Sequence, residues 1–125
     1  LLLFGFGRSL LRDLRSAEQA QMASHAGIGR LAVLESPEGE PPVGRAIALG
    51  PINSIGRNVN STIYVEDDFA SSSHAMLTFR GRSWYVEDQG STNGSYVNGH
   101  RIDRAVALSF GDELTIGRVR MRLER

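Results

Sequence analysis

The feature that most constrains the fold is a change in hydrophobic pattern after Gly29. From there on, β-branched and aromatic residues occur in short runs, and turn residues separate these runs about every 8 to 12 positions. Alternation with period two puts successive side chains on opposite faces of a strand, and many short strands at this spacing are typical of a sandwich or barrel. The pattern therefore predicts an all-β domain of two stacked sheets over residues 29–125. The clearest runs are 31–34, 46–49, 52–55, 63–65, 75–79, 84–86, 96–97, 114–116 and 119–123.

Size and composition exclude several classes of protein. The chain has 125 residues and no cysteine, so its core has to hold without disulfide bonds, and thiolate metal sites and cysteine nucleophiles are excluded. The formal net charge is zero. Non-specific nucleic-acid binding needs a basic surplus, because it depends on releasing counterions from phosphates. We therefore expect no nucleic-acid partner, and any recognition of phosphate must be local.

Residues 1–28 form a separate segment in this interpretation. An apolar cluster over residues 1–7 is followed by Arg8, Arg12 and Arg15, and residues 16–26 favour helix without a clear apolar face. Two interpretations stay open: the end of a truncated transmembrane helix with its arginines on the cytoplasmic side, or a short amphipathic helix. The first makes the protein cytoplasmic but membrane-associated. Because the chain begins at Leu1 rather than Met, we expect further sequence before it.

Motifs of catalysis are missing from the chain. A phosphate-binding GxxxxGK[ST] loop is excluded because the sequence has no lysine, and no GxSxG elbow is present. His25, His74 and His100 do not share the i, i+4 spacing of a helical metal site. The adjacent acidic pairs fall near strand ends, where neighbouring side chains point to opposite faces. The sequence therefore predicts no catalytic residue, no metal and no cofactor.

Polar clusters follow several of the predicted strands. They read SIGR at 54–57, ASSSHA at 70–75, EDQGSTNGSYVNG at 87–99 and FGDELTIG at 110–117. In this order and spacing they resemble the forkhead-associated (FHA) domain, whose pattern is GR, then SxxH, then DxGSTNGxxVNG, then GDx(I/L)xIG. The resemblance covers about residues 29–125. It implies a sandwich of about eleven strands in two sheets, whose loops at one end bind phosphothreonine peptides.

The resemblance assigns roles to individual residues. Arg57, Ser71 and Ser72 would bind the phosphate, although at the position of Ser72 the family more often has Arg or Asn. Thr92 and Asn93 would hold the peptide beside the phosphothreonine, Asn93 through its main chain. The remaining matched positions would support the binding loops, the histidine by bracing the turn of Ser71. These positions are Gly56, His74, Gly94, Asn98 and Gly99.

The residue types suit these roles. A phosphothreonine brings about −1.5 to −2 charges and three strong acceptor oxygens, and arginine offers a permanently charged planar fork of donors. The implied partners are phosphothreonine proteins, such as a Ser/Thr protein kinase or its substrates. A simple up-and-down path, however, would place the turn near Arg57 at the opposite end from Ser71 and Asn93. Only the resemblance predicts that these loops lie at the same end of the domain.

Alternative functions remain open. Arg118, Arg120 and Arg122 alternate with apolar residues, so they lie on one face of the last predicted strand. This face is either a binding stripe or a solvated surface balanced by acidic neighbours. The stripe or another sheet face would suit a phosphate-independent scaffold of the same fold. A third interpretation is that the chain is a targeting or autoinhibitory segment of a larger enzyme. Phe69 is a candidate for lining a side pocket that takes an apolar peptide residue.

Overall fold

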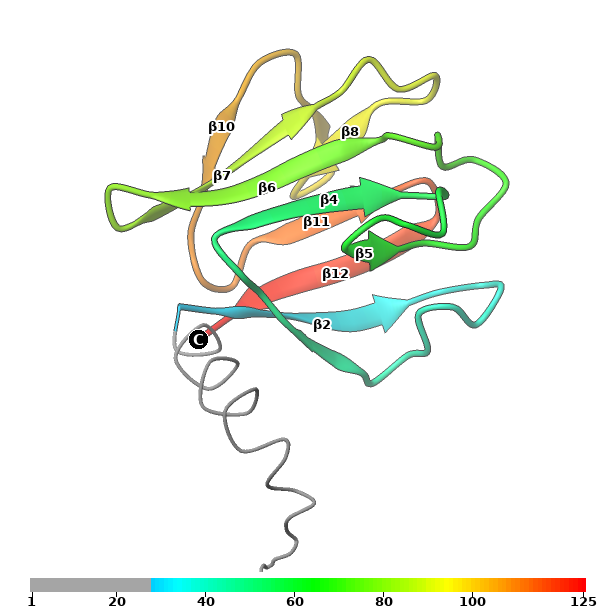
Figure 1. The fold of residues 1–125 in the computed structure, drawn as a ribbon, viewed down its shortest axis with the longest axis horizontal. Helices are drawn as coiled ribbons and strands as arrows, with labels where there is room; N and C mark the ends of the chain where they lie inside the picture. The colour runs from blue at the N-terminus through cyan, green and yellow to red at the C-terminus, as the bar shows by residue number, and fades with distance from the viewer. Residues whose placement is uncertain (1–27) are drawn as a thin grey trace, which may run out of the picture.

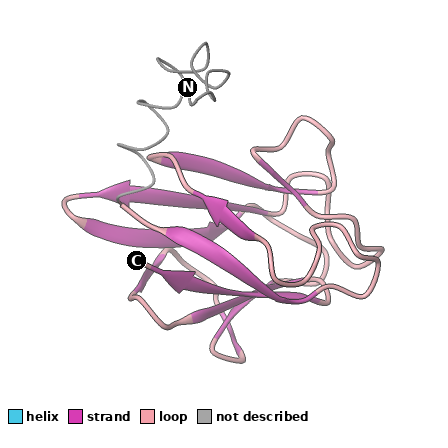
Figure 2. Ribbon diagram, turned by 90° about the horizontal axis from the view of Figure 1, so that it is seen from below, coloured by secondary structure: helices cyan, strands magenta, loops and turns pink. Residues whose placement is uncertain are grey.

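A computed structural model describes residues 28–125, and the expected helical or membrane-anchoring segment of residues 1–27 lies outside this range. The described chain is a sandwich of a five-stranded and a six-stranded sheet, which confirms the predicted fold class (Figure 1; Figure 2). Residues 28–125 contain no helix that is long and apolar enough to cross a membrane. The strands are β2 (Arg30–Glu35), β3 (Ala46–Ala48), β4 (Ile52–Gly56), β5 (Ile63–Tyr64), β6 (Ala75–Arg80), β7 (Ser83–Asp88), β8 (Ser95–Val97), β9 (His100–Arg101), β10 (Val106–Leu108), β11 (Glu113–Ile116) and β12 (Val119–Glu124).

The two sheets differ in strand order. The five-stranded sheet has the order β10-β7-β6-β4-β5, and the six-stranded sheet has the order β3-β2-β12-β11-β8-β9. Period-two alternation explains why these segments form strands that are buried on one face. In β12, for example, Val119, Met121 and Leu123 are fully buried, whereas the arginines between them are half-buried.

The core lies between the inner faces of the two sheets. Leu77 and Val86 from one sheet and Leu114 and Met121 from the other have no exposed surface. Burying each such side chain stabilises the fold by about 1.5 to 3 kcal/mol. Trp84 ties the first described residue to this core, because its indole N–H donates to the carbonyl of Ile28 over 2.8 Å. The sequence has no cysteine, so no disulfide adds to this packing.

The arginines of the last strand lie on the outer face of the six-stranded sheet, among acidic residues. Arg120 pairs with Glu35 at 3.2 Å and with Glu113 at 3.0 Å. Arg122 pairs with Glu124 at 3.2 Å on the same strand. The interpretation of this face as a balanced, solvated surface is therefore supported over that of a basic binding stripe.

The strand directions gather the polar loops at one end of the sandwich, on the right in Figure 1. The reason is that β5 runs parallel to β4, so the chain does not follow a simple up-and-down path. Antiparallel pairing of β4 with β6 then sets Ile55 opposite Ala75, and pairing of β6 with β7 sets Ala75 opposite Asp88. The loops that follow β4 and β7 thus lie beside the loop that precedes β6.

Candidate functional site

The residues expected to bind phosphate and peptide surround one open pocket at this end of the sandwich. Its volume is about 540 Å³. Arg57, Ser71 and Ser72 line it from the β4 and β6 loops, and Thr92 and Asn93 line it from the loop after β7. Asp68, Phe69 and Ala70 complete the lining. Segments that are far apart in the sequence therefore present a guanidinium, hydroxyl groups and a carboxamide to one space.

Backbone hydrogen bonds continue the pairing of β4 and β6 into the pocket wall. The N–H of Arg57 donates to the carbonyl of Ser71 over 3.0 Å, and the N–H of Asn58 donates to the carbonyl of Ser72 over 3.2 Å. Gly56 is required at this close approach, because a Cβ there would lie 2.1 Å from the carbonyl oxygen of Ser72. Any side chain at position 56 would push the two loops apart and move Arg57 relative to Ser71.

Ser71 is held so that its hydroxyl proton remains available to a ligand. Its Oγ accepts the N–H of Thr92 over 3.1 Å, and its own N–H donates to Nδ1 of His74 over 3.0 Å. An oxygen that already accepts one hydrogen bond can still donate its proton to an anion in the pocket. The position of Ser71 is therefore fixed by the loop after β7 and by His74 of its own loop.

His74 is buried behind the pocket and does not line it. Its Nδ1 accepts the N–H of Ser71, so the ring proton is on Nε2, which lies 2.8 Å from the carbonyl oxygen of Gly94. In this tautomer the ring accepts from one loop and donates to the other. The histidine thus braces the loop before β6 against the loop after β7.

Asn93 also joins the two loops. Its Nδ2 donates to the carbonyl of Phe69 over 3.0 Å, so the side chain holds the loop that contributes Ser71. The sequence interpretation assigned Asn93 to the peptide and did not predict this contact within the protein. Gly94, which follows, has a φ of +86°, and a Cβ there would lie 2.6 Å from Nε of Arg101. The positive φ of Gly94 therefore needs the conformational freedom of glycine, whereas the Arg101 side chain could move away from a Cβ.

Asp88 supports the loop after β7, and the sequence interpretation missed this role. Its Oδ1 accepts the hydroxyls of Ser91 and Ser95, both over 2.6 Å, and its Oδ2 accepts the N–H of Ser91 over 2.9 Å. Burial by itself raises the pKa of Asp88, but the hydrogen bonds from Ser91 and Ser95 outweigh it and hold the pKa below its ordinary value. Aspartate shortly before Gly-Ser is typical of an Asx turn, a signal that could have indicated this role.

An ion pair between a buried carboxylate and a partly exposed arginine lies beside Phe69, at the edge of the pocket. Asp67 has no exposed surface, and its Oδ1 lies 2.9 Å from Nη2 of Arg118. Its Oδ2 accepts the N–H of Phe69 over 3.1 Å, and the Arg118 guanidinium carbon lies 5.1 Å from the centre of the Phe69 ring. No local sequence pattern connects Asp67 with Arg118. The pair orients Phe69, which lines a second hollow of about 400 Å³ together with Asn93 and Tyr96.

Asn98 and Gly99 lie away from the pocket, in the turn between β8 and β9. Asn98 has a φ of +51° and Gly99 a φ of +83°, values that suit a tight turn. The carboxamide of Asn98 donates to Asp112 over 3.1 Å and accepts the N–H of Glu113 over 2.9 Å. These two residues therefore act on the sheet rather than on the pocket lining.

The electrostatics of the pocket favour an anion. Arg57 is exposed and forms no ion pair with any residue in the range 28–125. Asp68 contributes the one carboxylate of the lining. Across the described residues there is no group of three or more His, Cys, Asp or Glu that could hold a metal ion. The chemistry that this arrangement offers is binding of an oxyanion by an arginine fork and small hydroxyl donors.

Comparison with known proteins gives consistent matches. The model of the FHA domain family matches residues 53–117. The FHA domain-containing protein FhaB of Mycobacterium tuberculosis is 45% identical over 69 residues, which cover 55% of this chain and 44% of that protein. The oxoglutarate dehydrogenase inhibitor of Corynebacterium diphtheriae is 34% identical over 122 residues, which cover 93% of this chain and 82% of that protein. The chain thus spans less than half the length of FhaB.

One of the similar solved structures contains a phosphopeptide. It is the structure of Mycobacterium tuberculosis EmbR in complex with a low-affinity phosphopeptide, and it matches with a TM-score of 0.68 and 27% identity. The match covers 77% of this chain and 24% of that chain. The shared part is therefore one domain of a larger protein.

Proposed function

The chain belongs to the FHA domain family, and from this premise we propose that residues 29–125 form a module that binds phosphothreonine peptides through the pocket around Arg57. The observation that carries the proposal is the convergence of Arg57, Ser71 and Asn93 on one pocket, in which the guanidinium has no acidic partner among residues 28–125. The geometry of the pocket supports the role proposed for each residue. Arg57 pairs with the phosphate oxygens, Ser71 donates its hydroxyl proton, and Ser72 adds a second small donor.

The rest of the pocket positions the peptide. Thr92 and Asn93 form the rim across from Ser71, and the carboxamide of Asn93 keeps that rim attached to Phe69. A short peptide has to be ordered when it binds, so we expect a micromolar affinity, about −8 kcal/mol. The module works by binding, and the reaction that creates its ligand is performed by a kinase.

The proposed partners are proteins phosphorylated on threonine by a Ser/Thr kinase, or the kinase itself. The complex of EmbR with a phosphopeptide supports this class of partner. The oxoglutarate dehydrogenase inhibitor suggests that such a module can also regulate an enzyme by binding it. The paired charges on β12 and the formal net charge of zero favour a protein partner over nucleic acid.

A degenerate peptide library with a fixed phosphothreonine tests the proposal. The protein is immobilised and offered the library and its unphosphorylated twin, and bound peptides are identified by mass spectrometry. We expect capture of the phosphorylated library alone, with calorimetry of selected peptides in the micromolar range. Equal capture of both libraries, or capture that survives phosphatase treatment, would overturn the proposal and favour a phosphate-independent scaffold.

A further inference from the structure

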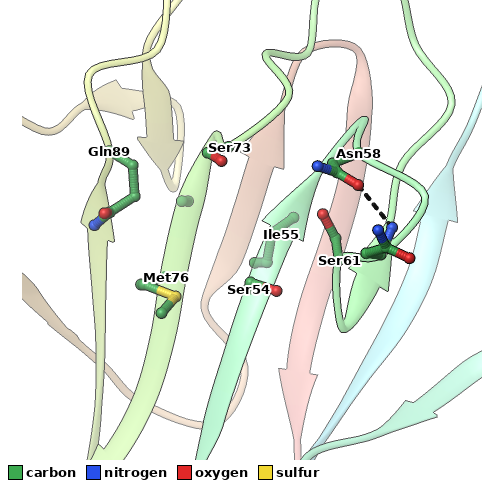
Figure 3. A pocket seen from close by; sticks show the side chains of 9 residues that line it. Ser54, Ile55, Asn58, Ser61, Ser73, Met76 and Gln89 are labelled. Atoms are coloured by element: carbon green, nitrogen blue, oxygen red, sulfur yellow. Dashed lines mark hydrogen bonds between the residues drawn. The ribbon is translucent and has the colours of Figure 1, made fainter.

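A third hollow, with a lining of polar and apolar groups, lies beside the phosphate pocket, on the outer face of the five-stranded sheet. Its volume is about 210 Å³. Figure 3 shows that it crosses three segments of the sheet: the end of β4 with the following loop, the start of β6, and the segment after β7. The side chains that matter for its chemistry are Ser54, Asn58, Ser61, Ser73, Met76 and Gln89.

The hollow and the phosphate pocket share a wall. Asn58 follows Arg57 in the chain and Ser73 follows Ser72, so each wall segment gives one residue to the pocket and the next to the hollow. The hydrogen bond from the N–H of Asn58 to the carbonyl of Ser72, 3.2 Å long, ties the two segments together. A ligand held at Arg57 therefore meets this hollow on leaving the pocket, just as it meets the hollow at Phe69 elsewhere on the rim.

The lining of the hollow combines polar and apolar groups and carries no charged residue. Part of it is internally satisfied: the Oγ of Ser54 accepts the N–H of Thr62 over 2.9 Å, and the Oδ1 of Asn58 accepts the N–H of Asn60 over 2.8 Å (Figure 3). The side chains of Ser61, Ser73 and Gln89 form no hydrogen bond with any residue in the range 28–125. These donors and acceptors are left for a ligand.

Apolar atoms complete the hollow between the polar groups. Met76 lies half-buried on the outer face of β6, and Ile55 and Ala75 are buried beneath it. A lone charge placed against this lining would lose hydration without gaining a partner, which is costly. An uncharged side chain with both donors and acceptors, or a small hydroxyl, matches the lining instead.

We propose that this hollow is a subsite for the same phosphopeptide and accepts an Asn, Gln, Ser or Thr side chain that flanks the phosphothreonine. The inference rests on the proposed function, since the phosphate at Arg57 anchors the peptide. An extended peptide advances about 3.3 Å per residue, so the accepted residue lies within about three positions of the phosphothreonine. The subsite makes the module select for an uncharged residue on one side of its target.

Charge changes at Gln89 test the subsite. The backbone N–H of Gln89 donates to the carbonyl of His74 over 2.8 Å, whereas its side chain is exposed, so substitution leaves the loop bracing intact. The parent, Gln89→Glu and Gln89→Lys are each offered the fixed-phosphothreonine library and its unphosphorylated twin. We expect the parent to enrich Asn, Gln, Ser or Thr at one flanking position. At that same position, Gln89→Glu should enrich Arg and Lys and Gln89→Lys should enrich Asp and Glu, each by about two- to fivefold.

Ala107→Glu and Ala107→Lys are the matched controls. Ala107 is exposed on β10 of the same sheet and does not line the hollow, so the same charge changes there should leave the peptide preferences unaltered. Phosphate-dependent capture without opposite preferences in the two Gln89 variants would overturn the subsite and leave the proposed function standing. Identical shifts in the Ala107 variants would also overturn it, because a general charge effect would then be the cause. Loss of phosphate dependence in the parent would overturn both proposals.

Discussion

Arginine occurs in two contrasting regions of this molecule. At the loop end, Arg57 is exposed and has no acidic partner among residues 28–125. On the six-stranded sheet, Arg120 and Arg122 pair with carboxylates at about 3 Å, and Arg118, in the turn before β12, pairs with Asp67 at 2.9 Å. The region with more arginines therefore offers less positive charge to a ligand. The availability of the guanidinium, rather than the number of arginines, decides where this domain can hold an anion.

The largest expected effect is on peptide binding, when Arg57 is removed. Arg57→Ala should weaken binding of a library-selected phosphothreonine peptide by about 2 to 4 kcal/mol, because it removes the fixed charge facing a dianion. Arg120→Ala, whose side chain is already occupied by Glu35 and Glu113, should change binding by less than about 1 kcal/mol. Isothermal titration calorimetry measures both. Equal losses in the two variants would contradict the distinction between free and paired arginine.

The next effect tests the backbone that places Arg57. Gly56→Ala puts a Cβ 2.1 Å from the carbonyl oxygen of Ser72, so we expect a loss of about 1 to 3 kcal/mol in the free energy of unfolding, together with weaker peptide binding. Gly50→Ala is the matched control, because a Cβ there has no atom within 4 Å. Urea unfolding should separate the two variants. A Gly56→Ala protein as stable as Gly50→Ala would show that the close approach is not required.

A smaller effect concerns the loop opposite Arg57. The folded-state pKa of Asp88 is lowered, so its contribution to stability is present above the ordinary carboxyl pKa of about 4 and is lost as pH falls through the folded value. Asp88→Asn should reduce stability at neutral pH by about 1 to 2 kcal/mol, since charged hydrogen bonds are lost, and the difference from the parent should shrink below about pH 4.

The control for this prediction is Asp103→Asn. Asp103 also has a lowered pKa, through its hydrogen bond from Arg104, but both side chains are largely exposed. Its replacement should hardly change stability at any pH, because exposed pairs contribute little. Thermal unfolding across the pH series compares the two variants. A constant difference between Asp88→Asn and the parent down to pH 2 would contradict the role given to the Asp88 carboxylate.

The smallest effect concerns the carboxylate that lies in the pocket lining. Asp68 is exposed and places a carboxylate in the lining beside Arg57. Asp68→Asn should therefore strengthen phosphopeptide binding, by less than about 1 kcal/mol, and the gain should decrease as salt is added. Calorimetry at low and high salt measures this change. Weaker binding by the variant at low salt would mean that Asp68 contacts the peptide favourably.

Much of the fold was predictable because apolar and polar side chains alternate along the core strands. In β6, Ala75 and Leu77 are buried and Met76 and Thr78 are half-buried, as the sequence pattern predicts. The path of the chain was not predictable in this way. The strand β5 has two residues, too few to show a period, yet its parallel pairing with β4 brings Arg57 beside Ser71.

The candidate site shows the same division. Motif spacing indicated Arg57, Ser71 and Asn93, because their residue types suit an anion and their order resembles a family pattern. The pairing of Asp67 with Arg118 left no signal, since a contact across the two sheets depends on tertiary structure. The hydrogen bond from the Asn93 side chain to the carbonyl of Phe69 was likewise not visible in the sequence. Local chemistry was thus visible in the sequence, and the bracing of the loops was not.

The central claim is that one phosphate binds among Arg57, Ser71 and Asn93. The most direct measurement is a two-dimensional nitrogen-proton NMR titration of the protein with a library-selected phosphothreonine peptide and with its unphosphorylated twin. We predict that the phosphopeptide shifts the amide signals of Arg57, Ser71, Thr92 and Asn93, whereas the twin leaves them in place. Shifts centred on β12, or equal shifts with both peptides, would contradict the account.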